Sequence, residues 1–348
     1  MTENSHVSSN LTKNLLLGLV EPYVSEPGAN EIYQLTKLAP GEFNSEVLQI
    51  INWAKNRDDL NFAFGLWAQE NTPIFKNVIE TFENLHFIPA NESLEEAQKV
   101  LDEWVVKETN GMIRKFPVSY EEGAAMLLAA VFSFEDKWVY SGRPIIDDYH
   151  TMESIEFAQQ LPFEDIYIDE VSVVIDNRLC NGFKFQVLFG PGRWEDHREM
   201  IGNVSLGAIS KNHLLKPVKR TKKGVVEIVT PVIELEQNFN LLEPASLGYE
   251  SISKINEGLP GVFPGAYVSQ AKQTTKILVN HEGVKAASVA AASLRLGAAM
   301  PMDYYDSWNI DLTSRPFRFR LVGANDMPGS FSKVFIEGTY SGGSSRNV

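Results

Sequence analysis

The sequence is poor in cysteine, in histidine and in long apolar runs. Its 348 residues include one cysteine, Cys180, which excludes an internal disulfide bond and a cysteine-based metal cluster. The six histidines lack the spacing of metal ligands. No apolar run reaches the roughly 18 residues that a membrane-spanning helix requires. We therefore expect no metal, no other cofactor and no insertion into a membrane.

Positive charge is also scarce. The chain has 31 lysines and arginines against 45 acidic residues, a formal net charge of −14. Such an excess of negative charge favours solubility and argues against nucleic-acid binding. The opening residues, MTENSHVSSN, lack the basic-then-apolar pattern of a signal peptide. The sequence does not identify the compartment; it slightly favours the cytoplasm, with the extracellular space as the alternative. We expect the protein to be a monomer.

Known catalytic motifs are missing. The sequence has no G-x-S-x-G elbow, no Walker loop and no H-E-x-x-H pair. The group 147–150 (DDYH) could be an acid–base cluster, but short acidic clusters are usually solvated loops. Gly190-Pro191-Gly192 is predicted to be a turn, because proline lacks the amide donor that a phosphate cradle needs. The chain is therefore not expected to be an enzyme.

Helical signals dominate the first third of the chain. Apolar residues recur at helical spacing over 44–55, and Thr72-Pro73 predicts the start of a helix that runs to about His86. A capping box, Ser93-x-x-Glu96, opens a helix that ends near Asn110. Residues 124–138 are nearly all apolar at first. They could form a central strand or a buried helix, and periodicity alone cannot separate the two.

Strand signals dominate the remainder. Asn181-Gly182 predicts a hairpin turn between two of the strands. With no internal repeat and no clean linker, the pattern indicates one α+β domain over residues 14–340. Residues 1–13 are predicted to be a disordered tail, and 341–348 a flexible C-terminal tail. The predicted strands are 60–68, 171–175, 183–189, 225–235, 274–279, 317–322 and 331–336.

One long segment between two predicted strands, at 276–279 and 317–322, consists largely of alanine and serine. Alanine is the best helix former, and a buried helix would suit the composition. The segment has no polar stripe, however, and long connections in compact domains are usually functional. Composition alone leaves both a helix and a functional loop open. The residues at helical spacing are Ala286, Ala287, Ala290, Ala291, Leu294 and Ala298.

Several stretches, taken together, resemble conserved segments of the serpin family and occur in the family's order. The resemblance implies a single domain with three β-sheets, surrounding helices and an exposed reactive-centre loop at about 284–310. It implies that a serine protease cleaves this loop, which then inserts into the main sheet as an extra strand. The resembling stretches are 101–113, 128–138, 238–247, 281–287, 315–319 and 329–338.

The resemblance also assigns roles to particular residues. Trp138 would lie at the top of the main sheet, and Gln273 at the position where that sheet opens. The scissile bond would lie in the window of Arg295, Leu296, Gly297, Ala298 and Met300. Arginine there would suit a trypsin-like protease, whereas leucine or methionine would suit a chymotrypsin- or elastase-like one. The hinge of the loop would comprise Glu282, Gly283, Val284, Lys285, Ala286, Ala287 and Ser288.

Departures from the family pattern leave inhibition open. Val284 stands where the family has threonine or serine, and Gln273 where it has histidine. The family's paired serines align with Gly18 and Glu21, and its asparagine with Ala130. No segment corresponds to the family's first helix. We therefore keep two hypotheses: a suicide inhibitor of serine proteases, and a non-inhibitory serpin-fold protein that binds, chaperones or stores.

A basic run in this acidic chain could bind a polyanion. A solvated loop before the strand at Val225 explains the same run more simply, because short charge runs are usually exposed. The residues are Lys216, Lys219, Arg220, Lys222 and Lys223.

Overall fold

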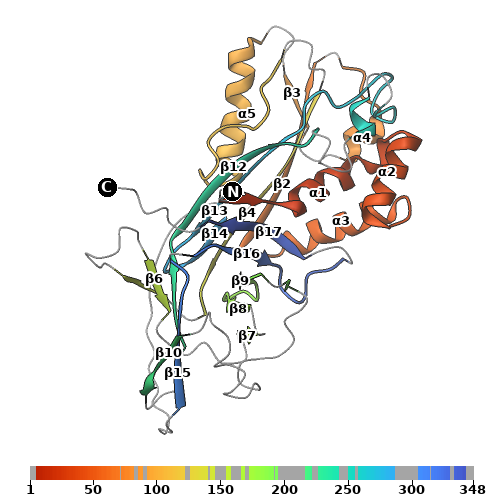
Figure 1. Cartoon of the computed structure of the whole chain (residues 1–348). Coiled ribbons are helices and arrows are strands. Elements are labelled where there is room, and N and C mark those ends of the chain that lie inside the picture. The colour runs from red at the N-terminus through yellow and green to blue at the C-terminus, as the bar shows by residue number, and fades with distance from the viewer. Residues whose placement is uncertain are drawn as a thin grey trace.

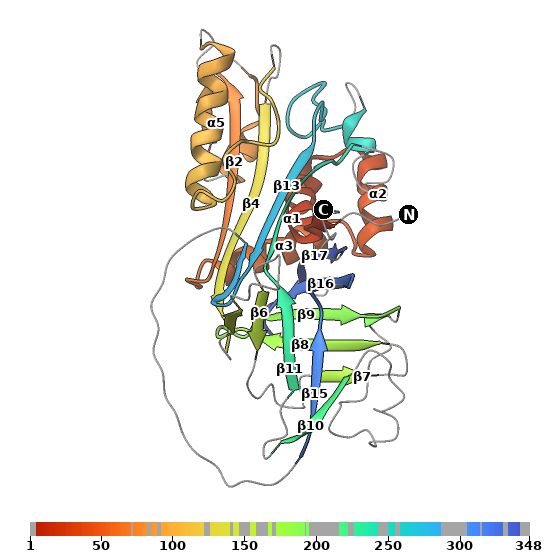
Figure 2. The same ribbon diagram turned by 60° about the vertical axis from the view of Figure 1, so that its left-hand side comes forward.

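A long central sheet separates one helix from the other helices. Figure 2 shows α5 on one face of this sheet, with α1, α2 and α3 on the opposite face. The helices are α1 (Asn10–Val20), α2 (Glu26–Thr36), α3 (Glu42–Ala54), α4 (Lys76–Thr81) and α5 (Leu94–Glu108), with 3-10 turns at Glu21–Tyr23 and Ser251–Ser253. The computed structural model describes residues 5–70, 72–81, 85–88, 92–121, 126–139, 142–145, 154–157, 166–168, 172–191, 193–194, 216–221, 226–242, 250–254, 258–286, 305–313, 315–329 and 333–341.

The described strands form three β-sheets (Figure 1). The main sheet has the order β12 (Ile233–Asn240), β13 (Lys272–Val279), β14 (Gly283–Ala286), β4 (Met126–Lys137), β2 (Leu60–Gln69) and β3 (Leu85–Ile88). The second sheet has the order β1 (His6–Ser8), β17 (Val334–Tyr340), β16 (Phe317–Val322), β9 (Lys184–Phe189), β8 (Val173–Arg178) and β7 (Ile166–Ile168). The third has the order β10 (Lys216–Thr221), β15 (Tyr305–Asp311), β11 (Val226–Pro231), β6 (Ser154–Phe157) and β5 (Arg143–Ile145). The predicted α+β domain with three sheets is confirmed.

Two apolar clusters hold the layers together. In the larger, the Phe183 ring lies 4.6 Å from Phe134 of the main sheet and 5.3 Å from Phe335 of the second sheet. The smaller cluster fills the space between the main sheet and α5, where Trp67 meets Trp104 edge-on at 4.7 Å. Aromatic pairs in this geometry add about 1 kcal/mol beyond their buried area.

Residues 5–13 are ordered, contrary to the tail predicted over 1–13, and residues 1–4 lie outside the described residues. Strand β1 pairs antiparallel with β17, and Val7 is fully buried. Ser9 caps α1 through a hydrogen bond from the Thr12 amide. The segment looks like a tail in the sequence because it is polar. Its order comes from backbone pairing with a strand more than 300 residues away, which composition does not reveal.

Other local predictions meet the structure unevenly. Within the apolar run at 124–138, residues 126–137 form a strand, β4, and the capping box of α5 is formed by Ser93 and Glu96. The helix predicted from Thr72 to His86 is wrong in length. The observed helix, α4, runs from Lys76 to Thr81, and Leu85 is the first residue of strand β3, which pairs with β2. The chain predicted as a loop at Lys216 is strand β10, because it pairs with β15.

The packing of α5 on the sheet can be tested with two neighbouring apolar residues. Leu101 is fully buried, whereas Val100 is 46% exposed. We expect Leu101→Ala to lower the free energy of unfolding by about 2–5 kcal/mol, because it leaves a cavity. Val100→Ala should change it by less than about 0.5 kcal/mol. Urea unfolding of both variants measures this, and equal losses would contradict the observed orientation of α5.

Candidate functional site

A tight hairpin joins β13 to β14 at the end of the main sheet where β4 ends, which is the lower end in Figure 2. The Asn280 side chain shapes the turn, because its Oδ1 accepts hydrogen bonds from the amides of Glu282 (2.9 Å) and Gly283 (3.1 Å). Trp138 ties the turn to β4: its indole N–H donates to the Asn280 carbonyl (2.8 Å), and its amide donates to the Glu282 carbonyl (3.2 Å). Trp138 is buried at this end of the sheet, and its role in sheet opening stays a prediction.

Strand β14 lies inside the main sheet, between β13 and β4. Val284 pairs with Val279 on one side and with Asp136 on the other. Gly283 is needed for this fit, because a Cβ added there would lie 2.1 Å from the Asp136 carbonyl oxygen. A single side-chain carbon would therefore collide with the backbone of β4.

The two faces of β14 differ in polarity. Val284 points into the core and is fully buried. Lys285 points to the other face, where its Nζ lies 3.3 Å from a carboxylate oxygen of Glu135. Both side chains of this ion pair are mostly covered, and such a pair contributes up to about 1 kcal/mol. The alternation is that of a strand with one buried face.

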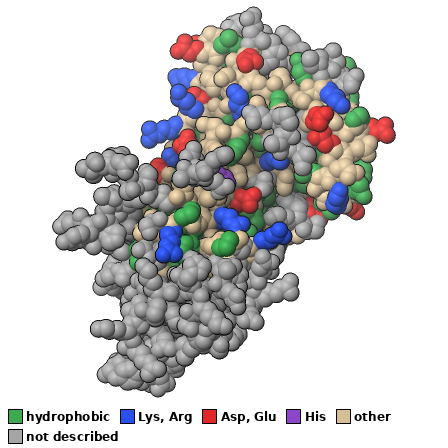
Figure 3. All heavy atoms as spheres, viewed as in Figure 1, with side chains coloured by type: hydrophobic (Ala, Val, Ile, Leu, Met, Phe, Trp, Pro, Cys, Tyr) green, Lys and Arg blue, Asp and Glu red, His purple; other side chains and the backbone are tan. Residues whose placement is uncertain are grey.

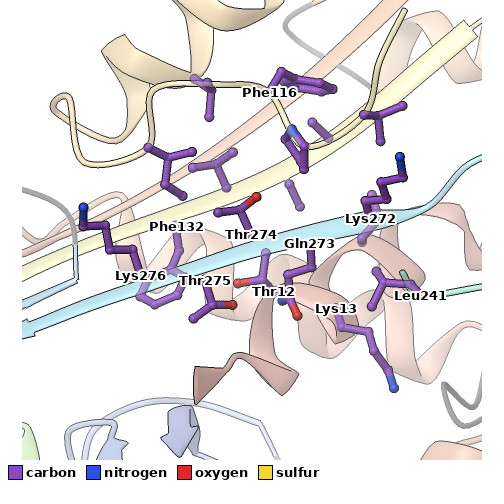
Figure 4. A pocket seen from close by; sticks show the side chains of 18 of the residues that line it. Thr12, Lys13, Phe116, Phe132, Leu241, Lys272, Gln273, Thr274, Thr275 and Lys276 are labelled. Atoms are coloured by element: carbon purple, nitrogen blue, oxygen red, sulfur yellow. The ribbon is translucent and has the colours of Figure 1, made fainter. Parts of the chain in front are cut away.

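Beyond Ala286, where β14 ends, strands β4 and β13 are left without a described strand between them. We call this unfilled gap in the main sheet the slot. The pairing of β14 ends where Ala286 faces Phe134. Along the rest of its length, β4 pairs with β2 on the edge that faces away from β13, and β13 pairs with β12 on the edge that faces away from β4. Within the described residues no backbone pairing joins β4 to β13. A cavity of about 70 Å³ lies between them instead. Figure 4 shows that the side chains lining this cavity come from both faces of the sheet.

One polar atom in the slot has no partner. The Thr275 side chain is buried on β13, and its Oγ1 makes no hydrogen bond. An unsatisfied buried hydroxyl costs about 1–3 kcal/mol. A strand or a water molecule entering the slot could supply the missing partner, so the slot suits a polar backbone better than an apolar ligand.

Polar contacts under the slot come from the start of α1. Gln273 of β13 is buried and donates from Nε2 to the Ser9 carbonyl (2.7 Å). The Ser9 hydroxyl donates to the Phe335 carbonyl (2.7 Å) and lies 2.9 Å from the Thr12 hydroxyl oxygen. Three segments that are distant in the sequence thus meet beneath the sheet opening.

The alignment of the family's paired serines with Gly18 and Glu21 is therefore wrong. The Glu21 carboxylate accepts hydrogen bonds from the amides of Gly41 (3.0 Å) and Asn44 (2.8 Å), away from the slot. A Cβ on Gly18 would collide with Val47 of α3, so this position serves helix packing. The hydroxyls under the slot belong to Ser9 and Thr12.

The predicted loop limits of 284–310 are also too wide. Residues 284–286 lie in β14, and 305–310 lie in β15, which pairs with β11 and β10. Backbone pairing on both sides of each segment overrides the loop-like composition. The interval between them, 287–304, lies outside the described residues. It includes Ala287, Ser288, Arg295, Leu296, Gly297, Ala298 and Met300.

The sequence did not reveal a buried carboxylate beside strand β14. Asp136 is 5% exposed, and burial raises its pKa to about 6. Its oxygens accept hydrogen bonds from the amides of Lys137 and Asn181, both at 2.8 Å, and from the Asn181 side chain at 3.2 Å. An aspartate inside an apolar strand was the available signal, but its partner Asn181 lies 45 residues away.

The remaining predicted sites are only partly described. Lys216, Lys219 and Arg220 lie on β10, whereas Lys222, Lys223 and the group 147–150 lie outside the described residues. On the face drawn in Figure 3, acidic and basic side chains are interspersed over the described part. Among the described residues there is no cluster of potential metal ligands, and no helix is long and apolar enough to cross a membrane.

The close fit of Gly283 against β4 yields a direct test. We expect Gly283→Ala to lower the free energy of unfolding by about 2–4 kcal/mol, or to expel β14, because its Cβ would meet backbone. Gly28→Ala in α2 is the matched control, since its Cβ would meet the Val24 side chain at 3.1 Å and alanine favours helix. Urea unfolding compares the two variants, and a tolerated Gly283→Ala would contradict the position of β14.

The orphaned hydroxyl in the slot yields another. Thr275→Val keeps the shape and removes a buried group without a partner, so we expect no loss of stability and a gain of up to about 1 kcal/mol. Thr109→Val is the control. The Thr109 hydroxyl donates to the Val105 carbonyl at 2.6 Å, so we expect a loss of about 1–2 kcal/mol. Equal losses in thermal or urea unfolding would show that Thr275 is not unsatisfied.

Known proteins share this architecture. No family model matches the chain. A curated relative, an alpha-1-antitrypsin-like protein of Tamias sibiricus, is 21% identical over 288 residues, which cover 75% of this chain and 66% of the relative, slightly under two thirds of its length. Among solved structures, Serpin48 of the insect Tenebrio molitor matches with a TM-score of 0.67 at 16% identity, covering 97% of this chain and 92% of that one. Human thyroxine-binding globulin complexed with thyroxine matches with a TM-score of 0.67 at 14% identity and the same coverage. The chain therefore has the serpin fold that its sequence motifs predict.

Proposed function

We propose that this chain is a suicide inhibitor of serine proteases, in which the segment 287–304 between β14 and β15 is the bait. One observation carries the proposal. Strand β14 already lies between β4 and β13 at one end of the main sheet, and along the rest of their described length these two strands are not paired with each other but line a cavity of about 70 Å³. A sheet that begins a strand and leaves the rest of its course open is suited to accept more of the same chain.

The chemistry belongs to the protease. Its serine attacks a carbonyl carbon of the bait, the peptide bond breaks, and the new amino end leaves with β15. The protease stays joined by an ester to the end that continues from β14. If this end enters the slot, each added residue forms ladder hydrogen bonds to β4 and β13, worth about 1 kcal/mol each. The ester-linked protease is carried along before water can release it.

The register of β14 supports this use of the bait sequence. Extended residue by residue, it would set Ser288 opposite Thr275, whose hydroxyl lacks a partner. The residues on the inward face would be Ala286, Ser288, Ala290 and Ala292, all of which are small. Small side chains can pass between covered faces at little steric cost, and a charge there would be expensive.

The same register supports a scissile bond near Arg295. Extended pairing would bring Ala291 opposite Lys272, where β13 begins, and Leu294 opposite Met126, where β4 begins. Cleavage before these positions would leave part of the slot empty. The candidate window, from Arg295 to Met300, begins just beyond them. A trypsin-like protease would cut after Arg295, and a chymotrypsin- or elastase-like one after Leu296 or Met300.

A non-inhibitory role is the second candidate, and one observation favours it. The hinge is held by the Lys285–Glu135 ion pair and by the two hydrogen bonds from Trp138, which could keep β14 from extending. One structural relative is described as bound to thyroxine, so the fold can serve ligand binding in another protein. The protease experiment separates these candidates.

Incubation with trypsin, chymotrypsin and elastase tests the proposal on denaturing gels. We expect a covalent complex whose mass is near the sum of the protease and this 39.0 kDa chain. Ser288→Glu should convert the chain into a substrate that is cut without a complex, because the carboxylate would enter the buried face. Ala287→Glu would face the other way, towards Lys276, and should still form the complex. Cleavage of the unmodified chain by all three proteases without any complex would refute inhibition.

A further inference from the structure

The buried carboxylate of Asp136 lies beside the valine that opens the inserted hinge. Asp136 and Val284 are direct cross-strand partners, so their side chains project to the same face of the main sheet. Both are buried, Val284 completely and Asp136 to 5% exposure. In an antiparallel pair the two Cβ atoms lie about 5 Å apart. The valine therefore covers the carboxylate from the side of β14.

Charge around Asp136 is only partly compensating. Its three hydrogen-bond donors are uncharged N–H groups of Lys137 and Asn181. The nearby Arg57 guanidinium is held by Asp59 in a two-point contact at 2.8 Å and also approaches Asp326 (3.8 Å). The Asp59 carboxylate opposes the charge on Asp136, and Arg57 supports it.

The other neighbouring groups do not neutralise Asp136 either. Cys180 lies close by, and its pKa is raised by burial and by the charge on Asp136. The Lys137 side chain is exposed on the opposite face, as its position on the strand requires. Lys285 also points to that face, where it is paired with Glu135. Burial is consequently the main influence on Asp136, which explains why its pKa rises to about 6 despite three donors.

We propose that Asp136 and Val284 form a pH-sensitive switch on the hinge, in which protonation of the carboxylate favours β14 within the sheet and ionisation favours its withdrawal. Withdrawal of β14 would remove Val284 and admit water to the carboxylate, which stabilises its charged form. An apolar residue at position 284 is what couples the two events, because it offers the carboxylate neither a hydrogen bond nor water. The switch rests on the proposed function only for its consequence, which is control of how readily the bait inserts.

The direction follows from proton linkage. With β14 inserted the pKa of Asp136 is about 6, and with β14 withdrawn it would approach the ordinary value of 3.8. The inserted form therefore binds more protons between these values, and acid favours it. For two such states, lowering the pH from about 7.5 to about 5 shifts the equilibrium towards insertion by about tenfold.

Hydrogen exchange of the intact chain tests this without any protease. Protection factors of the Val284 and Lys285 amides, corrected for intrinsic exchange, should rise by about tenfold from about pH 7.5 to about pH 5. Asp136→Asn should abolish the pH dependence. Glu135→Gln, which removes the adjacent carboxylate on the other face, should preserve it. Val284→Thr should move the midpoint to lower pH, because its hydroxyl can donate to the carboxylate.

A direct titration keeps the test decisive if Asp136→Asn fails to fold. The carboxyl carbon of Asp136 in the unmodified chain, followed by NMR, should titrate near pH 6. A midpoint below about pH 4.5, or hinge protection that does not change with pH, would overturn the switch. Neither measurement depends on inhibition, so failure of the proposed function and failure of the switch give different results.

Discussion

The incomplete pairing between β4 and β13 is the constraint on which the rest of the structure depends. The four residues of β14 lie between the C-terminal ends of these two strands, whereas the remaining parts of β4 and β13 line a cavity. Strand edges are stable when paired and costly when buried without partners. The sheet would gain hydrogen bonds if β14 continued between β4 and β13. The cavity, at about 70 Å³, holds only a few water molecules, so β4 and β13 must separate to admit a strand.

The side chains of strand β14 match the environments that the main sheet offers them. Val284 fits the buried face and Lys285 the solvated face, so the first residues of the strand are already matched to the sheet. Gly283 allows the close approach to β4. Two polar groups are unfavourably placed in this arrangement. Burial disfavours the charged form of Asp136, and the Thr275 hydroxyl lacks a hydrogen-bond partner. Both lie on the buried face of the main sheet.

Local signals in the sequence were sufficient for much of the fold. The capping box at Ser93 and the Asn181-Gly182 turn each depend on neighbouring residues, and both elements form as predicted. The order of β1, the network of Ser9 with Gln273 and the environment of Asp136 depend on chain segments far apart, so no local pattern reveals them. The alanine-rich composition after Gly283 suits helix, loop and strand alike. Only pairing with β13 and β4 decides for strand at 284–286, and the hinge role of these residues stays a prediction.

Thermal unfolding before and after a single cut within 287–304 tests the central claim, that the slot accepts the chain that follows β14. Insertion of about five or more residues would add several kcal/mol of pairing. The cut protein is expected to unfold at least about 10 °C above the intact protein. An unchanged or lower midpoint in the cut protein would contradict the claim, because the slot would then have remained empty.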